Sequence, residues 1–290
     1  MKILITGSKG MLGQMMAQVL SGHDLTLTDR EEMDVTDKLK VYKVIKLVKP
    51  DMIIHAAAFV DVERAESDPE LAKMINVDGS RNIAFAAKEV GATVIYISTD
   101  YVFDGEKRIP YTEDDEANPL GVYAKTKFLG EREIIKGCPE HYILRVSWLF
   151  GECLGGRNFV KTMIDLSSSK DEIKVINDQI GSPTYTRDIA KIVSQIADNI
   201  EAKKPIHWGI YNFSGEGETT RFDFTKEIFR QALIKTKLTP ISAKEFFAKA
   251  PRPAYSYLDK SKIEKALKIN VRTWQEMLKD YFSRETSSEA

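Results

Sequence analysis

The first residues of the chain constrain its fold most strongly. A short apolar run from Lys2 to Thr6 leads into Gly7, Gly10 and Gly13, and a helical pattern begins at Met11. Glycines at such a turn allow a tight bend, let backbone N–H groups approach a pyrophosphate and let the helix pack closely on the strand. The spacing is GxxGxxG rather than GxGxxG, so its position between strand and helix carries the inference. The sequence therefore predicts a phosphate-binding turn, with the helix N-terminus directed at the anion.

Short apolar runs and helical patterns then alternate through the first half of the chain. Because strands separated by helices form right-handed βαβ units, this alternation predicts an α/β fold with a doubly wound parallel, Rossmann-type sheet. The predicted strands are 2–6, 25–28, 51–55, 93–98 and 142–146, and the predicted helices are 11–21, 38–48, 71–90 and 123–135.

The alternation weakens after Gly151, where loops rich in Gly, Ser and Pro begin. Helical patterns recur at 187–200, 222–233 and 274–282. We therefore predict a nucleotide-binding domain over residues 1–150 and a smaller α/β substrate lobe over 151–290. Part of 186–202 is expected to fold back onto the first domain.

Composition limits the partners and the compartment. The formal net charge is −1, so bulk charge draws the chain neither to nucleic acid nor to an anionic membrane. No apolar run approaches the ~20 residues of a membrane span, and the N-terminus does not read as a signal peptide. Cys138 and Cys153 form no CxxC pair, which favours free thiols in a reducing, cytoplasmic setting.

An acid ends the second predicted strand. Asp29 follows the glycine turn by ~20 residues, where a carboxylate can bind ribose hydroxyls. Asp29 favours NADH, whereas the adjacent Arg30 could pair with a 2′-phosphate. The sequence leaves NADPH and NADH both open as cofactors.

The segment from Tyr123 to Lys127 carries the sharpest chemical signal. Four residues on a helix bring the phenol and the ammonium to one face. The nearby cation is expected to lower the pKa of Tyr123 from its ordinary value of ~10, towards proton transfer near neutral pH. Thr99 follows the strand 93–98 at the carboxyl edge of the sheet, where its hydroxyl can bond a substrate oxygen.

These features together resemble the extended short-chain dehydrogenase/reductase superfamily. Within it, four further segments resemble the dTDP-4-dehydrorhamnose reductase family. They are AESDPE at 65–70, SWLFG at 147–151, NDQIGSPT at 177–184 and RPAYS at 252–256. The resemblance extends from Lys2 to about Phe282.

The resemblance implies reduction of the C4 keto group of dTDP-4-dehydro-L-rhamnose, a nucleotide-sugar substrate, with NADPH or NADH as hydride donor. It implies that Tyr123 donates the proton, Lys127 tunes Tyr123 and holds the nicotinamide ribose, and Thr99 assists at the substrate oxygen. The protein would then supply position and electrostatics for chemistry that the nicotinamide carries.

Further site residues follow from the same resemblance. Met11 and Leu12 would lie in the phosphate loop, and Asp34 and Val35 beside the adenine. The cofactor cleft would be lined by Ala58, Phe59 and Val60. Asp100 and Trp148 would contact the sugar nucleotide, and its phosphates or base would be met by Asn158, Lys161 and Arg252.

The sequence departs from the family at one metal position. Some members hold Mg²⁺ with an acid two residues after the third glycine, where this chain has Met15, so we predict no metal there. The four histidines show no metal-ligand spacing.

Two other functions stay open from the residues. One is a nucleotide-sugar epimerase or dehydratase on the same scaffold, although no Glu stands beside Asp100 for elimination. The other is a non-catalytic NADP-binding regulatory subunit, similar to the beta subunit of methionine adenosyltransferase. A homodimer is one expected assembly, and the sequence leaves the nucleotide and the sugar configuration open.

Overall fold

The computed structural model describes residues 1–152 and 158–288. Its centre is a six-stranded sheet with the order β10-β5-β4-β3-β1-β2, and every pair in it is parallel. The strands are β1 (Lys2–Thr6), β2 (Asp24–Thr28), β3 (Met52–His55), β4 (Thr93–Thr99), β5 (His141–Val146) and β10 (Gly209–Phe213). The predicted α/β class with a doubly wound parallel sheet is confirmed.

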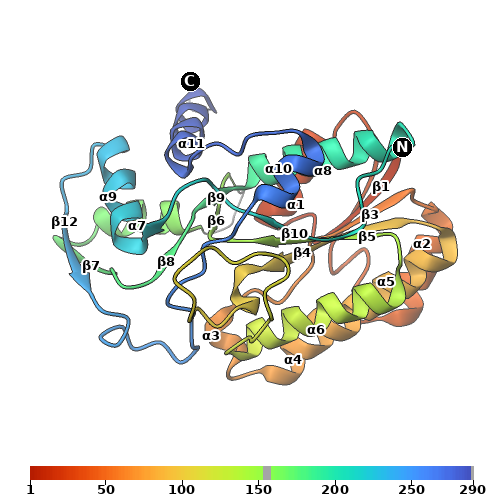
Figure 1. The fold of residues 1–290 in the computed structure, drawn as a ribbon, viewed down its shortest axis with the longest axis horizontal. Coiled ribbons are helices and arrows are strands. Elements are labelled where there is room, and N and C mark those ends of the chain that lie inside the picture. Colours follow the sequence, from red (N-terminus) through yellow and green to blue (C-terminus); the bar gives the residue numbers. More distant parts are fainter. Residues whose placement is uncertain (153–157, 289–290) are drawn as a thin grey trace.

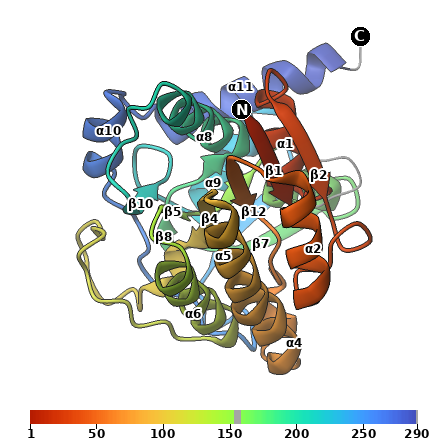
Figure 2. The same ribbon diagram turned by 90° about the vertical axis from the view of Figure 1, so that its right-hand side faces the viewer.

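Helices cover both faces of this sheet (Figure 1). The helices α1 (Met11–Val19) and α8 (Thr186–Glu201) pack together on one face. The helices α2 (Lys38–Val48), α5 (Gly79–Val90) and α6 (Val122–Gly137) cover the other. Because successive strand residues point to opposite faces, Ile3 and Ile5 enter the core on the α1 side and Leu4 enters the core on the α2 side. Figure 2 shows this layering with α8 above the sheet and α6 below it.

The chain reverses its direction across the sheet between β1 and β3. It runs from β1 outward to β2, returns to β3 beside β1, and then continues outward through β4, β5 and β10. In open α/β sheets, ligands bind beyond the carboxyl ends of the strands at such a reversal. The fold therefore places a binding cleft where the glycine turn, the end of β3 and the end of β4 meet.

The predicted continuous helix over 71–90 is divided. The helix α4 (Pro69–Lys73) is followed by a π-helical turn, Met74–Asp78, before α5 begins. This turn carries Asn76, whose side-chain amide bonds the backbone N–H and C=O of Phe59 at 2.8 and 3.2 Å. The irregular turn thereby fixes the loop after β3, which borders the cleft.

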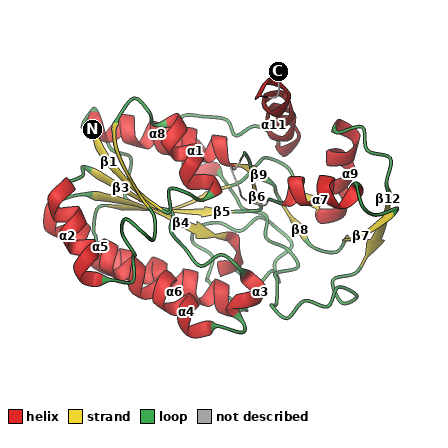
Figure 3. Ribbon diagram, turned by 180° about the vertical axis from the view of Figure 1, so that it is seen from behind, coloured by secondary structure: helices red, strands yellow, loops and turns green. Residues whose placement is uncertain are grey.

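The remaining elements form a smaller body at the carboxyl end of the sheet (Figure 3). Its strands pair as β6 (Leu149–Phe150) with β9 (Thr184–Tyr185), β7 (Glu172–Ile176) with β12 (Lys237–Ile241), and β8 (Ile180–Gly181) with β11 (Thr219–Thr220). Its helices and the short helices beside the cleft are α3 (Val62–Ala65), the 3₁₀ turn Asp100–Val102, α7 (Phe159–Ser167), α9 (Arg221–Gln231) and α11 (Trp274–Ser288). The helix α10 (Ser261–Leu267) packs instead on β10 of the central sheet.

Segments of the second half also join the sheet domain. Strand β10, which the sequence did not predict, pairs with β5, and α8 packs on α1. The division into 1–150 and 151–290, with part of 186–202 returning, stays a prediction. In the part of the chain that the structure describes, no helix combines the length and the apolar character that a membrane span requires.

Candidate active site

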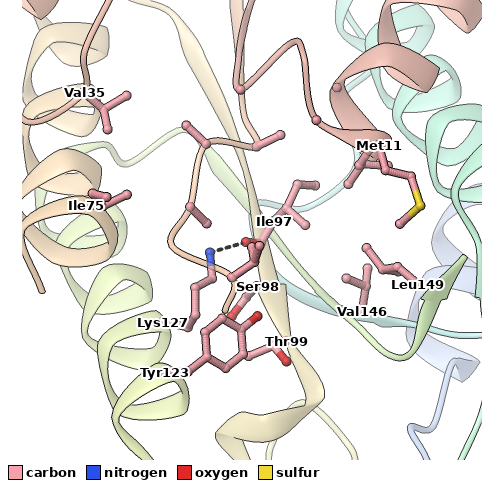
Figure 4. Close-up of a pocket in the computed structure, with 18 of the residues that line it drawn as sticks. Met11, Val35, Ile75, Ile97, Ser98, Thr99, Tyr123, Lys127, Val146 and Leu149 are labelled. Atoms are coloured by element: carbon pink, nitrogen blue, oxygen red, sulfur yellow. Dashed lines mark hydrogen bonds between the residues drawn. The ribbon is translucent and has the colours of Figure 1, made fainter. Parts of the chain in front are cut away.

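A cavity of about 830 Å³ opens at the reversal point of the sheet. Most of the residues predicted from the sequence line it. They are Gly7, Gly10, Met11, Leu12, Gly13, Asp29, Arg30, Asp34, Val35, Ala58, Val60, Thr99, Asp100, Tyr123, Lys127 and Trp148. Figure 4 shows the part of the cavity where Tyr123, Thr99 and Lys127 converge.

The glycine turn leaves no room for side chains. Gly7 has a φ of 65°, and a Cβ on it would lie 2.7 Å from the backbone nitrogen of Ala57. A Cβ on Gly13 would overlap the carbonyl oxygen of Gly7. Gly10 caps α1 without a side-chain hydrogen bond, so the first amides of this helix have no side-chain acceptor at the cap. This geometry suits close approach of an anion.

The acid after β2 ties the adjacent loops together. The Asp29 carboxylate accepts the backbone N–H of Lys9 at 3.0 Å and that of Arg30 at 2.8 Å. The Arg30 side chain is exposed and lies 3.5 Å from the Asp34 carboxylate. Asp34 also accepts hydrogen bonds from the backbone and hydroxyl of Thr36. The Asp29 carboxylate and the Arg30 guanidinium thus lie at the same end of the cavity, as the sequence suggested.

Phe59 lies differently from its neighbours Ala58 and Val60, which line the cavity. Its side chain packs with Ala65 and Ala72, and it is not among the residues that line the cavity. Its role in the structure is to hold the loop through the Asn76 amide.

Helix α6 presents Tyr123 and Lys127 to the cavity one turn apart. Its N-terminus is held by Glu66, whose carboxylate accepts the N–H of Val122 at 2.7 Å. A carboxylate at this position satisfies an open amide and favours the positive end of the helix. The segment around Glu66 therefore positions the helix that carries the phenol.

The predicted fall in the pKa of Tyr123 is wrong. Burial raises the pKa of Tyr123 above its ordinary value, and the Thr99 hydroxyl only partly opposes this rise. Burial also lowers the pKa of Lys127 to about 7. The Lys127 ammonium donates to the carbonyl oxygen of Ile97 at 2.7 Å rather than to the phenol (Figure 4). Sequence spacing placed the two groups on one face but could not weigh their desolvation.

Behind Lys127 lies a buried ionic network. Glu131, one turn further along α6, pairs with Arg145 through two hydrogen bonds of 3.0 and 2.8 Å. Ser98 donates to the same carboxylate at 2.5 Å. The Glu131 charge opposes the fall in the pKa of Lys127. The Lys127 ammonium also lies 4.1 Å from the ring centroid of Tyr96.

Thr99 and Asp100 form the other wall. Thr99 donates to the Asp100 carboxylate at 3.1 Å, and Ser147 donates to its second oxygen at 2.9 Å. Burial raises the pKa of Asp100, while hydrogen bonds from Ser256, Ser147 and Thr99 lower it. The position after Asp100 is Tyr101, whose ring meets that of Tyr123 edge-on at 6.1 Å.

Trp148 is held in an unusual backbone conformation. Its φ is 45°, in the left-handed region, and its carbonyl accepts the N–H of Thr184 at 3.1 Å. A Cβ on Gly181 would lie 2.7–2.9 Å from three indole atoms, so only glycine leaves room for the ring. Strain of this kind persists where the surrounding structure enforces it, which is frequent at ligand sites.

A comparison with known proteins identifies the family. The family described as RmlD substrate binding domain matches residues 1–287. The dTDP-4-dehydrorhamnose reductase of Aggregatibacter actinomycetemcomitans is 40% identical over 288 residues, covering 96% of this chain and 97% of that protein. The chain belongs to the dTDP-4-dehydrorhamnose reductase family.

Solved structures of the same family agree along the whole chain. A dTDP-4-dehydrorhamnose reductase from Clostridium acetobutylicum is 41% identical with a TM-score of 0.93, covering 99% of this chain and 100% of that one. One from Bacillus anthracis, solved in complex with NADP, is 35% identical with a TM-score of 0.91, covering 98% and 99%. The resemblance stated from the sequence is confirmed.

Three predicted substrate contacts lie outside the cavity lining of this reductase-family chain. Asn158 caps α7, accepting the N–H of Lys161 at 2.9 Å and donating to the Gly151 carbonyl at 2.7 Å. Lys161 is exposed. The Arg252 guanidinium pairs with Glu63 at 2.8 Å. Because Asn158 uses its side chain as a helix cap, the sequence motif there has a structural explanation.

Sequence reasoning missed Arg221, a cation at the start of α9 that reaches the cavity. It lines the cavity, and its guanidinium carbon lies 3.6 Å from the ring centroid of Trp148. Neither spacing nor a family motif marks it, since it follows β11 far along the chain from the glycine turn. Only the folding of α9 against the loop after β5 reveals it.

The histidine at the end of β3 has hydrogen-bond partners in the core. His55 at the end of β3 bonds the hydroxyls of Thr6 and Ser80, and burial lowers its pKa to about 3, so it is neutral. Within residues 1–152 and 158–288, no three His, Cys, Asp or Glu side chains gather as metal ligands. Met15 lies on α1 and is buried in the core. Cys138 is a buried free thiol, and Cys153 lies outside the described residues.

Proposed function

We propose that the chain reduces the C4 keto group of dTDP-4-dehydro-L-rhamnose to dTDP-L-rhamnose, with NADPH or NADH as the hydride donor. The observation that carries this proposal is the convergence of Thr99, Tyr123 and Lys127 in the cavity that the glycine turn opens. Family membership over residues 1–287 supports the substrate class. A family relative solved in complex with NADP supports the cofactor class.

The residues present fit a dinucleotide. Gly7 and Gly13 leave no room for a Cβ, and with Gly10 they form a turn next to the amides of α1, which have no side-chain cap. Asp29 and Arg30 stand where the adenosine ribose would lie, which leaves both cofactors open. When bound, the reduced nicotinamide supplies the hydride.

Tyr123 serves as the proton donor. Its raised pKa keeps the phenol protonated at neutral pH, so it has a proton to give to the developing oxyanion at C4. The Thr99 hydroxyl, which hydrogen bonds the phenol, is placed to share the substrate oxygen. Lys127 is anchored by the Ile97 carbonyl beside β4, where it would hold a ribose hydroxyl and stabilise charge on the phenol as it forms.

The sugar nucleotide would lie between the walls of the same cavity. Asp100, with its hydroxyl partners, can accept or donate hydrogen bonds to sugar hydroxyls. The Trp148 indole offers an apolar face for the ring of the sugar or the base. Phe59, predicted as a cofactor contact, and Asn158 and Lys161, predicted as substrate contacts, lie outside the cavity lining.

We further propose a cytoplasmic protein that assembles as a homodimer and does not bind nucleic acid. The near-neutral net charge supports the lack of nucleic-acid binding. The buried free thiol of Cys138 supports the cytoplasmic compartment. The homodimer is tested by measuring the molar mass in solution, and a monomer at micromolar concentration would contradict it.

The reaction is tested by following oxidation of NADPH and NADH with freshly prepared dTDP-4-dehydrorhamnose. Tyr123→Phe should lose turnover by roughly 100-fold or more while binding cofactor as the wild type does, because only the transferable proton is removed. Tyr42→Phe on α2, away from the cavity lining, is the matched control and should keep full activity. Wild-type cofactor binding without any turnover would instead favour the regulatory-subunit function.

A further inference from the structure

Arg221 is the buried cation that the proposed chemistry has not used. It begins α9 and lines the cavity next to Trp148, Asp100 and Tyr101. Its side chain is mostly withdrawn from solvent. Taking a guanidinium out of water is costly unless an anion or polar partner compensates it.

Other withdrawn arginines of the described chain each have a carboxylate partner. Arg145 pairs with Glu131, Arg252 pairs with Glu63, and Arg272 pairs with Asp188. Across residues 1–152 and 158–284, no carboxylate oxygen reaches salt-bridge distance of the Arg221 guanidinium, whose closest groups are aromatic. Arg221 therefore has charge left for a ligand.

The flat faces of the guanidinium stack on two aromatic rings, and the Tyr101 hydroxyl accepts a hydrogen bond from its N–H edge. Its carbon lies 3.6 Å from the Trp148 ring centroid and 5.0 Å from that of Phe159. Stacking of this kind fixes the plane of an arginine and leaves its fork of N–H donors available. Such a fork matches two oxygens of a phosphate better than a lone ammonium does. Trp148 is itself fixed by its left-handed backbone and by Gly181.

The Asp100 carboxyl does not fully neutralise the charge of Arg221. Asp100 attracts Arg221, but the Asp100 carboxyl is already bonded by Thr99 and Ser147 and its pKa is raised by burial. Burial lowers the pKa of Arg221; Tyr101 and Asp100 oppose this fall, and the like charge of Arg252 adds to it. Two guanidiniums that repel across one region favour an anion between them.

We propose that Arg221 binds the diphosphate of the nucleotide sugar through its N–H edge, with Trp148 as the platform that orients it. This inference rests on the proposed function for the identity of the nucleotide, whereas the diphosphate chemistry follows from a stacked guanidinium that no carboxylate of residues 1–152 and 158–284 pairs at salt-bridge distance. The cofactor also contains a diphosphate, but its proposed cradle is the glycine turn at Gly7–Gly13. The two sources are therefore separable by ligand.

The test compares the affinities of dTDP, thymidine and NADPH by calorimetry for the full-length wild type, Arg221→Gln and Arg221→Lys. Arg221→Gln should weaken dTDP by about ten- to hundredfold, as expected for loss of charged hydrogen bonds. Thymidine and NADPH should bind as before. Arg221→Lys should recover part of the dTDP affinity, because it restores the charge without the fork. The matched control is Arg230→Gln on the exposed side of the same helix, where Arg230 pairs with Glu227.

Three outcomes would overturn the inference. One is unchanged dTDP affinity in Arg221→Gln, and another is an equal loss for thymidine and dTDP, which would mean that Arg221 only supports Trp148. The third is a loss for NADPH as large as that for dTDP. If Arg221→Gln fails to fold, Arg221→Lys carries the test, and dTDP affinity equal to wild type would overturn the phosphate fork.

Failure of the proposed reaction gives a different result. A wild type that binds dTDP through Arg221 but does not reduce the keto-sugar would refute the function and leave the diphosphate site intact. A wild type that reduces the keto-sugar, with Arg221→Gln unchanged in dTDP affinity, would refute only the inference.

Discussion

Replacing Gly181 with alanine should displace Trp148 from the cavity wall. The added Cβ would lie 2.7 Å from indole Cε2 and 2.8 Å from Cζ2, whereas an ordinary contact is 3.4–4 Å. The ring must therefore move by roughly 0.7 Å or more, since its backbone is fixed by the hydrogen bond from Thr184. Gly181 lies in β8 without a positive φ, so alanine adds no backbone strain there. Overpacking of this kind costs about 1–3 kcal/mol of folding stability.

The functional effect should fall on the sugar nucleotide alone. A displacement approaching 1 Å at a positioning group can cost up to ~100-fold in rate, so we expect kcat/KM for the keto-sugar to fall by roughly 10- to 100-fold. The dissociation constant of NADPH should stay within about twofold, because the glycine turn is untouched. Steady-state kinetics, cofactor titration and urea unfolding measure the three quantities. The control is Gly22→Ala, where a Cβ meets nothing within 4 Å and no loss is expected.

The reasoning fails if Gly181→Ala keeps the wild-type kcat/KM for the keto-sugar. Retained stability together with retained kinetics would mean that the indole has room to move without consequence. Loss of cofactor affinity in the same variant would mean that the second lobe also shapes the dinucleotide site.

Two further predictions concern the residues beneath the phenol. Glu131→Gln should lower the free energy of unfolding by about 3–5 kcal/mol, because it leaves a buried arginine without its charge partner. Glu133→Gln, which breaks an ion pair nearer the surface on the same helix, should cost less than about 1 kcal/mol in urea unfolding, and equal losses would refute the distinction. Lys127 has a pKa lowered from 10.5 to about 7, so from pH 7 to 10.5 the unfolded chain holds a proton that the folded chain lacks. Its contribution to the free energy of unfolding therefore rises with pH across that window. Lys127→Met should remove that slope, stabilise the fold by roughly 1–3 kcal/mol at pH 8 and abolish turnover, whereas a slope identical to wild type would refute the assigned pKa.

Some of the candidate site could be predicted from local patterns alone. Gly7 to Gly13 can be recognised because a turn without side chains has few sequence solutions, and Tyr123 and Lys127 because helical spacing fixes a shared face. Thr99 and Asp29 follow because the ends of parallel strands meet at one edge. The same reasoning failed for other residues. Asn158 is a polar residue that was expected to contact the substrate, yet its side chain caps the N-terminus of α7.

The sequence by itself determined the alternation of strands and helices, the phosphate-binding turn and the helical face of the phenol. These depend on contacts between residues close in the chain. Only the tertiary structure decided that β10 joins the sheet, that burial raises the pKa of Tyr123, and that Arg221 reaches the cavity without a carboxylate partner. Desolvation and charge pairing depend on which distant segments exclude water from a group. The periodicity of the sequence does not show which segments these are.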